Sequence, residues 1–518
     1  MTRLLFAAAL LAAATVAAED RKTVIVFPPT STAKLPEGLT VAIHEAAHAA
    51  LAPTHNLIHA RQLLAMTSRH RMQLSDLSEP NTARAAAQRL GAHIFVYSTL
   101  QEDKTGWTLT TWTSRVGSPK TATTTVLLPL TITSALQKAG GALADAALRY
   151  DGRGAHKADL LTPYNGADDA MRDYASCAAT LLKQPIGIEN PTVLRESELS
   201  YAVEQCEKAV KTDPHFGAAW AALALGSAIS SNDARAVAAL AKAPAQLPNA
   251  ILARFWLVSR YQSTDAAEKL LVETIVKAPG FLLARAYLAE LYNALGRQGE
   301  AAKAWEAYAD QTSPNPFVIS KLAYTLSKMG KADASVAYAE KALAYDSASV
   351  ELNLELASRY LDAGRVEKAI ATLEPFAKPP DVGADVVLRL GYAKMLKGEN
   401  DVAEMLLTRA ITLAKEPSEW RTRGRAKLNL AQLYLKKTNK EQAKQYLLEA
   451  MKEGLRPKPT APDTKDVMAL LSPEELKSFE TVSTAVKESS PFGLKGGEVN
   501  PAAKRDGEPS GFDAVKVK

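Results

Sequence analysis

After its first twenty residues, the sequence contains no apolar run long enough to span a membrane. It also has no strong cluster of basic residues, because the formal net charge of +6 is spread over 518 residues. A diffuse charge argues against a nucleic-acid partner, which would need a clustered basic face. No P-loop, dinucleotide-binding glycine motif or nucleophile elbow is present. We therefore expect a soluble protein that is not an enzyme and needs no cofactor.

The first residues, MTRLLFAAALLAAATVAAED, have the organisation of a secretory signal peptide. Arg3 supplies a positive charge, and Leu4–Val16 form an apolar core too short to span a bilayer comfortably. Val16-Ala17-Ala18 then offers small residues at a cleavage site. We predict a signal peptide at residues 1–18, a mature chain that begins near Glu19 and a periplasmic location. An uncleaved membrane anchor is the alternative.

Cysteine is rare: the chain contains only Cys177 and Cys206, which fall on neighbouring predicted helices. In an exported protein such a pair can oxidise, so a disulfide between them is one possibility. Two buried thiols at helix contacts are the other. The sequence leaves both interpretations open.

The middle of the chain repeats. A small residue recurs, followed four positions later by a mostly bulky or apolar residue and three positions after that by another residue that is mostly apolar. Consecutive small positions lie 34 residues apart in five of seven steps, and glycine marks several turns between them. This spacing predicts a helix-turn-helix unit in which small residues allow close helix packing. The small positions are Ala202, Ala236, Ala267, Ala301, Ser335, Ala369, Ala403 and Ala443.

The repeat resembles the tetratricopeptide repeat (TPR), with about eight units over residues 167–456. The resemblance implies a right-handed α-solenoid whose groove, lined by the first helix of each unit, binds extended peptides or partner helices. The Lys and Asn pattern of a carboxylate clamp is not visible at the inner positions. We therefore predict a groove of mixed character that binds a protein or peptide partner. The candidate partner-binding residues are Tyr287, Glu290, Asn293, Lys321, Tyr324, Lys328, Arg389, Tyr392, Asn429 and Gln432.

Residues 19–152 lack this period and alternate strand-like and helix-like segments. KTVIVFPP is typical of a buried strand, and AHIFVYSTLQ, GWTLTTWTSRV and KTATTTVLLPL predict three further strands. The order β-α-β-α-β-β-β-α predicts a small α/β domain with a three-stranded meander, so the whole chain combines α+β and all-α parts. We expect a polar linker at 153–166. Residues 457–518 should hold a proline-rich linker, a capping helix that begins at Ser472 and a disordered tail.

This first domain resembles the amino-terminal domain of TolB and its FlgO-type relatives. The matching features are a strand that ends in Phe27-Pro28, the EGLT helix start, and the Leu90-Gly91-Ala92 turn that leads into Ile94–Leu100. ADDAMRDYASCAATLL and AVEQCEKAVKTDPHFGAAWAALA are similar to the first repeat of proteins that join this domain to TPRs. The resemblance implies interaction and assembly at the cell envelope, without catalysis. In many relatives a cytosolic regulator or cyclase module stands where this chain has a signal peptide.

One motif suggests another function. Residues 43–52 read IHEAAHAALA, and HExxH on a helix is how zinc peptidases hold their metal and general base. However, the apolar positions Ile43, Ala46, Ala47, Ala50 and Leu51 already explain an amphipathic helix that packs on a sheet. We expect the two histidines of this motif at the boundary or solvent face of that helix.

A third zinc ligand is missing from the expected register. The metzincin pattern would need glycine and histidine where the chain has Leu51 and Thr54. We therefore predict no catalytic residue, and at most a weak metal site at His44 and His48, with His55 nearby. A zinc metallopeptidase with a TPR tail is the alternative function. A structural subunit of a homo-oligomer is the second alternative, since the oligomeric state is not evident from the sequence.

Overall fold

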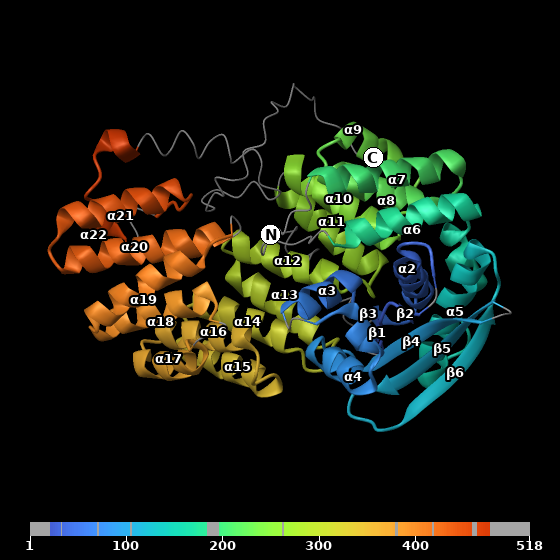
Figure 1. The fold of residues 1–518 in the computed structure, drawn as a ribbon, viewed down its shortest axis with the longest axis horizontal. Coiled ribbons are helices and arrows are strands. Elements are labelled where there is room, and N and C mark those ends of the chain that lie inside the picture. Colours follow the sequence, from blue (N-terminus) through green and yellow to red (C-terminus); the bar gives the residue numbers. More distant parts are fainter. Residues whose placement is uncertain are drawn as a thin grey trace, which may run out of the picture. The chain divides into compact units, whose positions relative to one another are not determined.

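The computed structural model describes residues 21–32, 34–69, 72–103, 106–183, 196–261, 264–378, 382–416, 419–457 and 464–476. The predicted signal peptide and the predicted disordered tail lie outside these residues. The chain divides into two compact units between Ile319 and Ser320 (Figure 1). Within the described ranges, no helix is both long enough and apolar enough to cross a membrane.

The first unit begins with a mixed sheet whose strand order is β3-β1-β4-β5-β6, with β2 paired to β4. β1 runs parallel to β3 and β4, whereas β4, β5 and β6 form an antiparallel meander. The predicted small α/β domain is confirmed, including its three-stranded meander. The strands are β1 (Thr23–Val26), β2 (Thr30–Ser31), β3 (Asn56–Leu57), β4 (Ile94–Asp103), β5 (Gly106–Arg115) and β6 (Thr121–Leu128).

Helices cover both faces of this sheet (Figure 1). On one face, α2 (Leu39–Leu51) packs against α5 (Ile132–Tyr150), which lies across β4, β5 and β6. Gly140 permits this close approach, because a Cβ there would lie 2.8 Å from the Cβ of Ala46. On the other face, Phe95 and Tyr97 pack beneath three short elements. These are α3 (Ala60–Arg69), which we did not predict, the 3-10 helix η1 (Leu74–Ser78) and α4 (Pro80–Arg89).

Four helix pairs complete the first unit. Each pair joins a first helix to a second helix of one repeat, in the order expected from the sequence. The pairs are α6 (Asp168–Leu182) with α7 (Glu196–Thr212), α8 (Gly217–Ile229) with α9 (Asp233–Leu240), α10 (Pro248–Tyr261) with α11 (Thr264–Lys277), and α12 (Leu283–Ala294) with α13 (Gln298–Ala309). Before them, η2 (Ala158–Tyr164) lies in the predicted linker and buries Leu161 and Tyr164.

Four more pairs follow from residue 316 onward. They are α14 (Pro316–Lys328) with α15 (Ala332–Tyr345), α16 (Val350–Asp362) with α17 (Val366–Leu373), α18 (Ala384–Lys397) with α19 (Asn400–Leu413), and α20 (Trp420–Lys436) with α21 (Lys440–Lys452). The 3-10 turn η3 (Glu374–Phe376) follows α17. A helical repeat solenoid therefore follows the α/β domain, as predicted. The turn glycines Gly296, Gly330, Gly364 and Gly398 have φ of 70–89°, a left-handed conformation that ends a helix.

Small side chains allow the two helices of each pair to pack closely. All seven alanines of the predicted small positions are at most 2% exposed. The eighth position holds Ser335, and its hydroxyl donates a hydrogen bond to the carbonyl of Ala323 at 2.7 Å. A polar atom therefore replaces a methyl group without being left unpaired.

A short segment covers the end of the last repeat. Val467 and Met468 of α22 (Lys465–Met468) pack against Leu447 of α21. Ser472 and Glu475 then form a capping box, in which each backbone amide donates to the other side chain at 2.7 and 3.2 Å. The apolar surface of the terminal repeat is thus protected, as α-solenoids require.

Candidate functional site

Glu45, the central acid of HEAAH, connects the α/β domain to two repeat helices. Its Oε1 accepts a hydrogen bond of 3.3 Å from the Nδ2 of Asn249 on α10. Its Oε2 accepts one from the hydroxyl of Tyr174 on α6. Burial raises the pKa of Glu45, whereas both hydrogen bonds and the nearby charge of Arg61 act in the opposite direction. Glu45 is therefore a structural hydrogen-bond acceptor inside the first unit.

The two histidines of the motif are buried, so our prediction of a boundary or solvent face was wrong. His44 and His48 are 1% and 4% exposed, and their ring centroids lie 4.1 Å apart. His59, just before α3, lies 6.4 Å from His48 and is also buried. The sequence pattern assumed that one partner covers α2, but the sheet, α5 and α6 all contact it.

Burial controls the charge of this histidine cluster. Loss of solvent lowers the pKa of His44 to about 4 and the pKa values of His48 and His59 well below their usual value. His55 is buried elsewhere, 3.4 Å from Asp151, and its pKa is also lowered to about 4, mainly by burial. In the part of the chain that the structure describes, no group of three or more His, Cys, Asp and Glu side chains is placed to hold a metal ion.

Helix α2 and the following segment pack directly on the repeats. Gly38 starts α2 with φ of 78°, and a Cβ there would lie 2.0 Å from the carbonyl oxygen of Ala175 on α6. Only glycine permits both this conformation and this approach. On α3, the Nε2 of Gln62 donates to the hydroxyl of Tyr308 on α13 at 2.8 Å. These contacts fix the α/β domain against the first helix α6 and the second helix α13.

The sheet itself continues this contact. The backbone amide of Leu57 in β3 donates to the carbonyl of Gly280 at 2.9 Å, so a loop of the repeats covers that sheet edge. At the predicted Leu90-Gly91-Ala92 turn, the Nδ2 of Asn315 donates to the carbonyl of Leu90 at 2.9 Å. The amide of Ser313 donates to the carbonyl of Gly91 at 2.8 Å. The first four repeats thus bind the α/β domain of the same chain.

Comparison with known proteins supports the repeat assignment. A family model for the tetratricopeptide repeat matches residues 319–349 and 424–453. The chain carries tetratricopeptide repeats. A search of the curated proteins finds no match to this chain.

Several solved structures, two of them of TPR proteins, are similar to parts of the chain. A TPR protein of Thermus thermophilus is 21% identical, with 39% of this chain and 99% of that chain covered and a TM-score of 0.29. A TPR protein of Parabacteroides merdae is 13% identical, with 55% and 93% covered and a TM-score of 0.35. Yeast Tom70 is 14% identical, with 62% and 65% covered and a TM-score of 0.40.

The structure divides the predicted partner-binding residues of the TPRs into two groups. Tyr287 and Glu290 lie on α12 in the first unit, where burial raises both pKa values, that of Glu290 to about 7. Tyr287 is buried and its ring stacks on Phe255, with centroids 4.9 Å apart. Asn293, one turn further along α12, is half-buried. Tyr287 is therefore packed within the first unit, whereas Glu290 and Asn293 keep part of their surface exposed.

The second group lies in the second unit and remains accessible. Lys328 is exposed, and the others are half-buried, namely Lys321, Tyr324, Arg389, Tyr392, Asn429 and Gln432. The ammonium of Lys328 lies 5.4 Å from the ring centroid of Tyr324, and Arg359 approaches the same ring to 5.2 Å. Arg389 donates a hydrogen bond to the hydroxyl of Ser358.

Sequence reasoning did not single out Arg359 and Arg425, which lie on first helices of the second unit. The signal that could have found them is the recurrence of arginine on successive first helices. Cys177 on α6 and Cys206 on α7 are joined by a disulfide, with Cα atoms 5.5 Å apart. This bridge connects the two helices of the first repeat.

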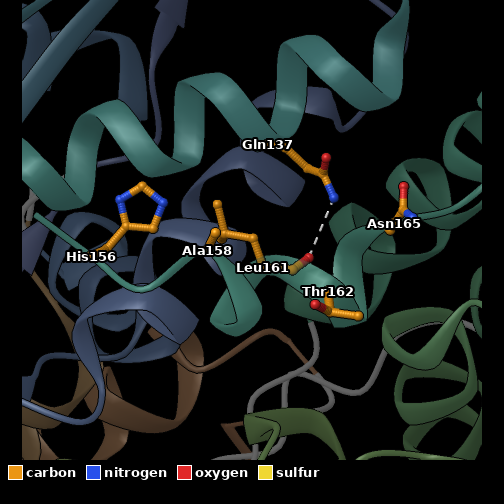
Figure 2. A pocket seen from close by; sticks show the side chains of 6 residues that line it. All are labelled: Gln137, His156, Ala158, Leu161, Thr162 and Asn165. Carbon is orange, nitrogen blue, oxygen red and sulfur yellow. Dashed lines mark hydrogen bonds between the residues drawn. The ribbon is translucent and has the colours of Figure 1, made fainter.

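The first unit also has a shallow hollow, beside η2. Figure 2 shows the amide of Gln137 directed across it to the carbonyl of Leu161, at 3.5 Å. The imidazole of His156, which also lines the hollow, is bound through Nδ1 to Asp145 at 2.8 Å. The lining residues are Gln137, His156, Ala158, Leu161, Thr162 and Asn165. Their polar groups serve the local fold and do not converge on a ligand position.

Proposed function

We propose that the protein is a non-catalytic scaffold whose second unit binds a protein or peptide partner through the first helices of its TPRs. One observation carries this proposal. The first helices α6 and α10 of the first unit are engaged by the α/β domain, whereas those of the second unit keep tyrosine, lysine and arginine side chains accessible. Grooves of this type bind extended or helical segments of other proteins.

The proposal places this scaffold in the periplasm, where it serves envelope assembly or maintenance. The signal-like first residues support export, and the Cys177–Cys206 bridge fits an oxidising compartment. The TolB-like sequence features of the α/β domain support an envelope component as its docking partner. In this arrangement the α/β domain attaches the protein to the envelope, and the second unit captures a partner segment.

Site-specific photocrosslinking in cells tests the proposed groove. A photoreactive amino acid at Tyr392 or Asn429 should form adducts with a defined partner, because both side chains are accessible on first helices. The same amino acid at Tyr287 should form none, because that side chain is buried inside the first unit. Arg409 on the second helix α19 provides the matched control.

Two results would contradict the proposal. One is an equal yield of adducts from Arg409 and Tyr392, which would show that the first helices are not selected. The other is an absence of adducts from both Tyr392 and Asn429. Osmotic-shock fractionation of the same cells tests the location, and recovery with cytoplasmic markers would contradict export.

A further inference from the structure

The sheet of the α/β domain has two edges, and they differ in how they are covered. At one edge, the amide of Leu57 in β3 donates a hydrogen bond to the carbonyl of Gly280 in the repeats. At the other edge, β6 pairs only with β5 in the part of the chain that the structure describes. Figure 1 shows β6 at the outer edge of the sheet. An edge strand that has no neighbour presents a row of unpaired backbone groups, which can accept a further strand.

The hydrogen-bond pattern of the sheet shows which backbone groups of β6 point outward. The amide of Val116 donates to the carbonyl of His93, so the even-numbered residues of β5 bond to β4 and the odd-numbered ones bond to β6. In the β5–β6 register, odd-numbered residues of β5 lie opposite even-numbered residues of β6. The odd-numbered residues from Thr121 to Leu127 therefore direct their amides and carbonyls away from the sheet.

Strand β6 lacks the features that usually protect an edge strand. Its sequence, TATTTVLL, contains no charged residue, proline or glycine, and its register with β5 is continuous, without a bulge. Leu127 is 51% exposed, and Leu130, just after the strand, is 71% exposed. The exposed residues of the strand alternate between the two faces of the sheet, so both faces are open at this edge. They are Thr121, Ala122, Thr123, Thr125 and Leu127.

The sequence of β6 fits a second copy of itself. An antiparallel copy centred on Thr124 places Thr123 opposite Thr125 and Ala122 opposite Val126, on both sides of the centre. Each pair joins side chains of similar polarity, and threonine pairs stabilise neighbouring strands. A twofold dimer requires such a self-complementary surface, whereas a strand of another protein would not require this symmetry.

Charge does not oppose this pairing. The charged residue nearest to β6 along the chain is Lys120, which would lie opposite Leu128 of the other copy. The two copies of Lys120 would then be eight residues apart along the strand direction, which is roughly 27 Å. This separation exceeds the screening length of about 8 Å at physiological salt, so the two ammonium groups repel each other little.

We propose that β6 pairs with β6 of a second copy of this chain, which joins the two sheets into one continuous antiparallel sheet. The outward amides and carbonyls of Thr123 and Thr125 then exchange hydrogen bonds between the two copies. A contact of two eight-residue strands is small, so the dimer is weak and reversible. The inference goes beyond the proposed function, because it concerns a different surface and a different partner from the TPR groove.

The mass of the purified protein in solution tests the proposal. Analytical ultracentrifugation between about 1 and 100 μM should show a rise from the mass of one chain to that of two. Thr123→Lys/Thr125→Lys sets lysine opposite lysine at both pairs and should weaken the dimer at least about tenfold. Thr408→Lys/Thr412→Lys adds the same charge at exposed threonines of α19 and should dimerise as the wild type does.

Thr123→Glu/Thr125→Glu is the complementary variant. Alone it should be monomeric, as the lysine variant is. A mixture of the two should form a dimer with one copy of each, because opposite charges then face one another at every pair, and added salt should weaken this mixed dimer. Circular dichroism melts show that both variants fold. If two folded variants do not dimerise when mixed, the antiparallel pairing is wrong.

A single introduced cysteine tests the register. The two native cysteines are bridged to each other, so the chain has no free thiol of its own. Thr124→Cys places a thiol opposite its own copy, in a pair whose Cα atoms lie about 4.5 Å apart, and mild oxidation should give a covalent dimer. Ala122→Cys is the control on the same face, because its two copies lie roughly 14 Å apart. Equal yields of covalent dimer from the two variants would contradict this register.

Two further results overturn the proposal outright. A protein that remains a monomer up to about 100 μM does not associate through β6, and this edge is then open to a strand of another protein. A dimer that persists in folded Thr123→Lys/Thr125→Lys is held together by another surface. Photocrosslinking from Tyr392 and Asn429 reports on the TPR groove alone, so the proposed function can hold where this inference fails.

Discussion

The first helices of the two units are built alike but differ in charge. In the first unit, α6, α8, α10 and α12 carry four basic and four acidic residues. In the second unit, the corresponding helices carry eleven and four. Helices α6 and α10 of the balanced set contact a domain of the same chain, whereas Lys328 and Arg425 of the basic set are exposed. The two sets of first helices therefore differ in net charge and in their contact with that domain.

The comparison between the two units also shows what the HEAAH motif (residues 44–48) does in the fold. Its glutamate contacts the first helices α6 and α10 in the region where a TPR groove would receive a ligand. Its histidines pack into the same buried region. The motif therefore belongs to the interface between the α/β domain and the repeats. Changes there should affect the first unit and leave the second unaffected.

The largest effect is expected from Glu45→Ala. This change leaves the hydroxyl of Tyr174 and the amide of Asn249 without their acceptor in a buried site. We expect a loss of about 3–5 kcal/mol in the unfolding free energy of the first unit. Tryptophan fluorescence can follow it during urea unfolding, because five of the six tryptophans lie before residue 320.

Glu37→Ala is the matched control, because Glu37 is an exposed glutamate just before α2. It should change the stability by less than about 0.5 kcal/mol. Equal stability of Glu45→Ala and wild type would show that the interface does not depend on this carboxylate. A parallel shift in the unfolding of the second unit would contradict its independence.

The next largest effect should follow removal of the Cys177–Cys206 bridge. The bridge spans 29 residues, and cross-links of this length stabilise by about 2–4 kcal/mol. We expect Cys177→Ala/Cys206→Ala to unfold at lower urea concentration in the fluorescence signal of the first unit. A reducing agent should have the same effect on the wild type and none on this variant. Two freely titrating thiols in oxidised wild type would contradict the bridge.

Acid should weaken the first unit through its buried histidines. Unfolded histidine titrates near pH 6.5, whereas His44 in the folded state has a pKa of about 4. Between these values the unfolded state binds more protons, so stability falls as the pH falls. The slope is up to about 1.4 kcal/mol per pH unit for each such histidine. Glu45 and Glu290 oppose this, because a raised carboxyl pKa favours the folded state at low pH.

The His44→Leu variant isolates the contribution of one histidine. Relative to the wild type, its unfolding free energy should improve steadily between about pH 6.5 and pH 4, because the variant has no proton to take up on unfolding at this position. His215→Leu is the control, since His215 is exposed. If the unfolding free energies of His44→Leu and of the wild type depend on pH in the same way, protonation of His44 does not cause the loss of stability in acid.

The sequence predicted the repeats well, because their signal is periodic and local. Small residues at fixed spacing are also the residues that pack closest in the structure, such as Ala301 and Ala403, which are both fully buried. The α/β domain was predicted nearly as well, since its strands alternate or cluster in hydrophobicity. Helix α3 was missed although its sequence, ARQLLAMTSR, is amphipathic, because the strand-like residues Asn56–Leu57 lie just before it.

The interface between the domain and the repeats could not be predicted. An amphipathic pattern shows that one side of α2 is buried, but it does not show that a second partner covers the other side. His44 and His48 were therefore assigned to the surface, and Tyr287, which is buried, to an open groove. Each assignment failed for the same reason, which is that contacts between residues far apart in the sequence leave no local periodic trace.

The smallest effect expected is a gain in stability at Arg285. This residue lies on α12, is 2% exposed, and none of its guanidinium nitrogens has a hydrogen-bond partner among the described residues. Burial lowers its pKa to about 10. One repeat later the corresponding residue is Ile319, which is buried. Replacing an uncompensated charge with an apolar side chain of similar length should therefore stabilise the first unit, by about 1–2 kcal/mol for Arg285→Met.

Arg254→Met on α10 is the comparison, because the Nη1 of Arg254 donates to the carbonyl of Ala245 at 2.9 Å. Removing that paired guanidinium should leave stability equal or slightly lower, as measured by urea unfolding. If Arg285→Met instead loses stability, the guanidinium contributes more to the native packing than its missing partners imply. In that case buried charge would stabilise the covered repeats as well, and the difference between the two units would have to rest on the domain contacts alone.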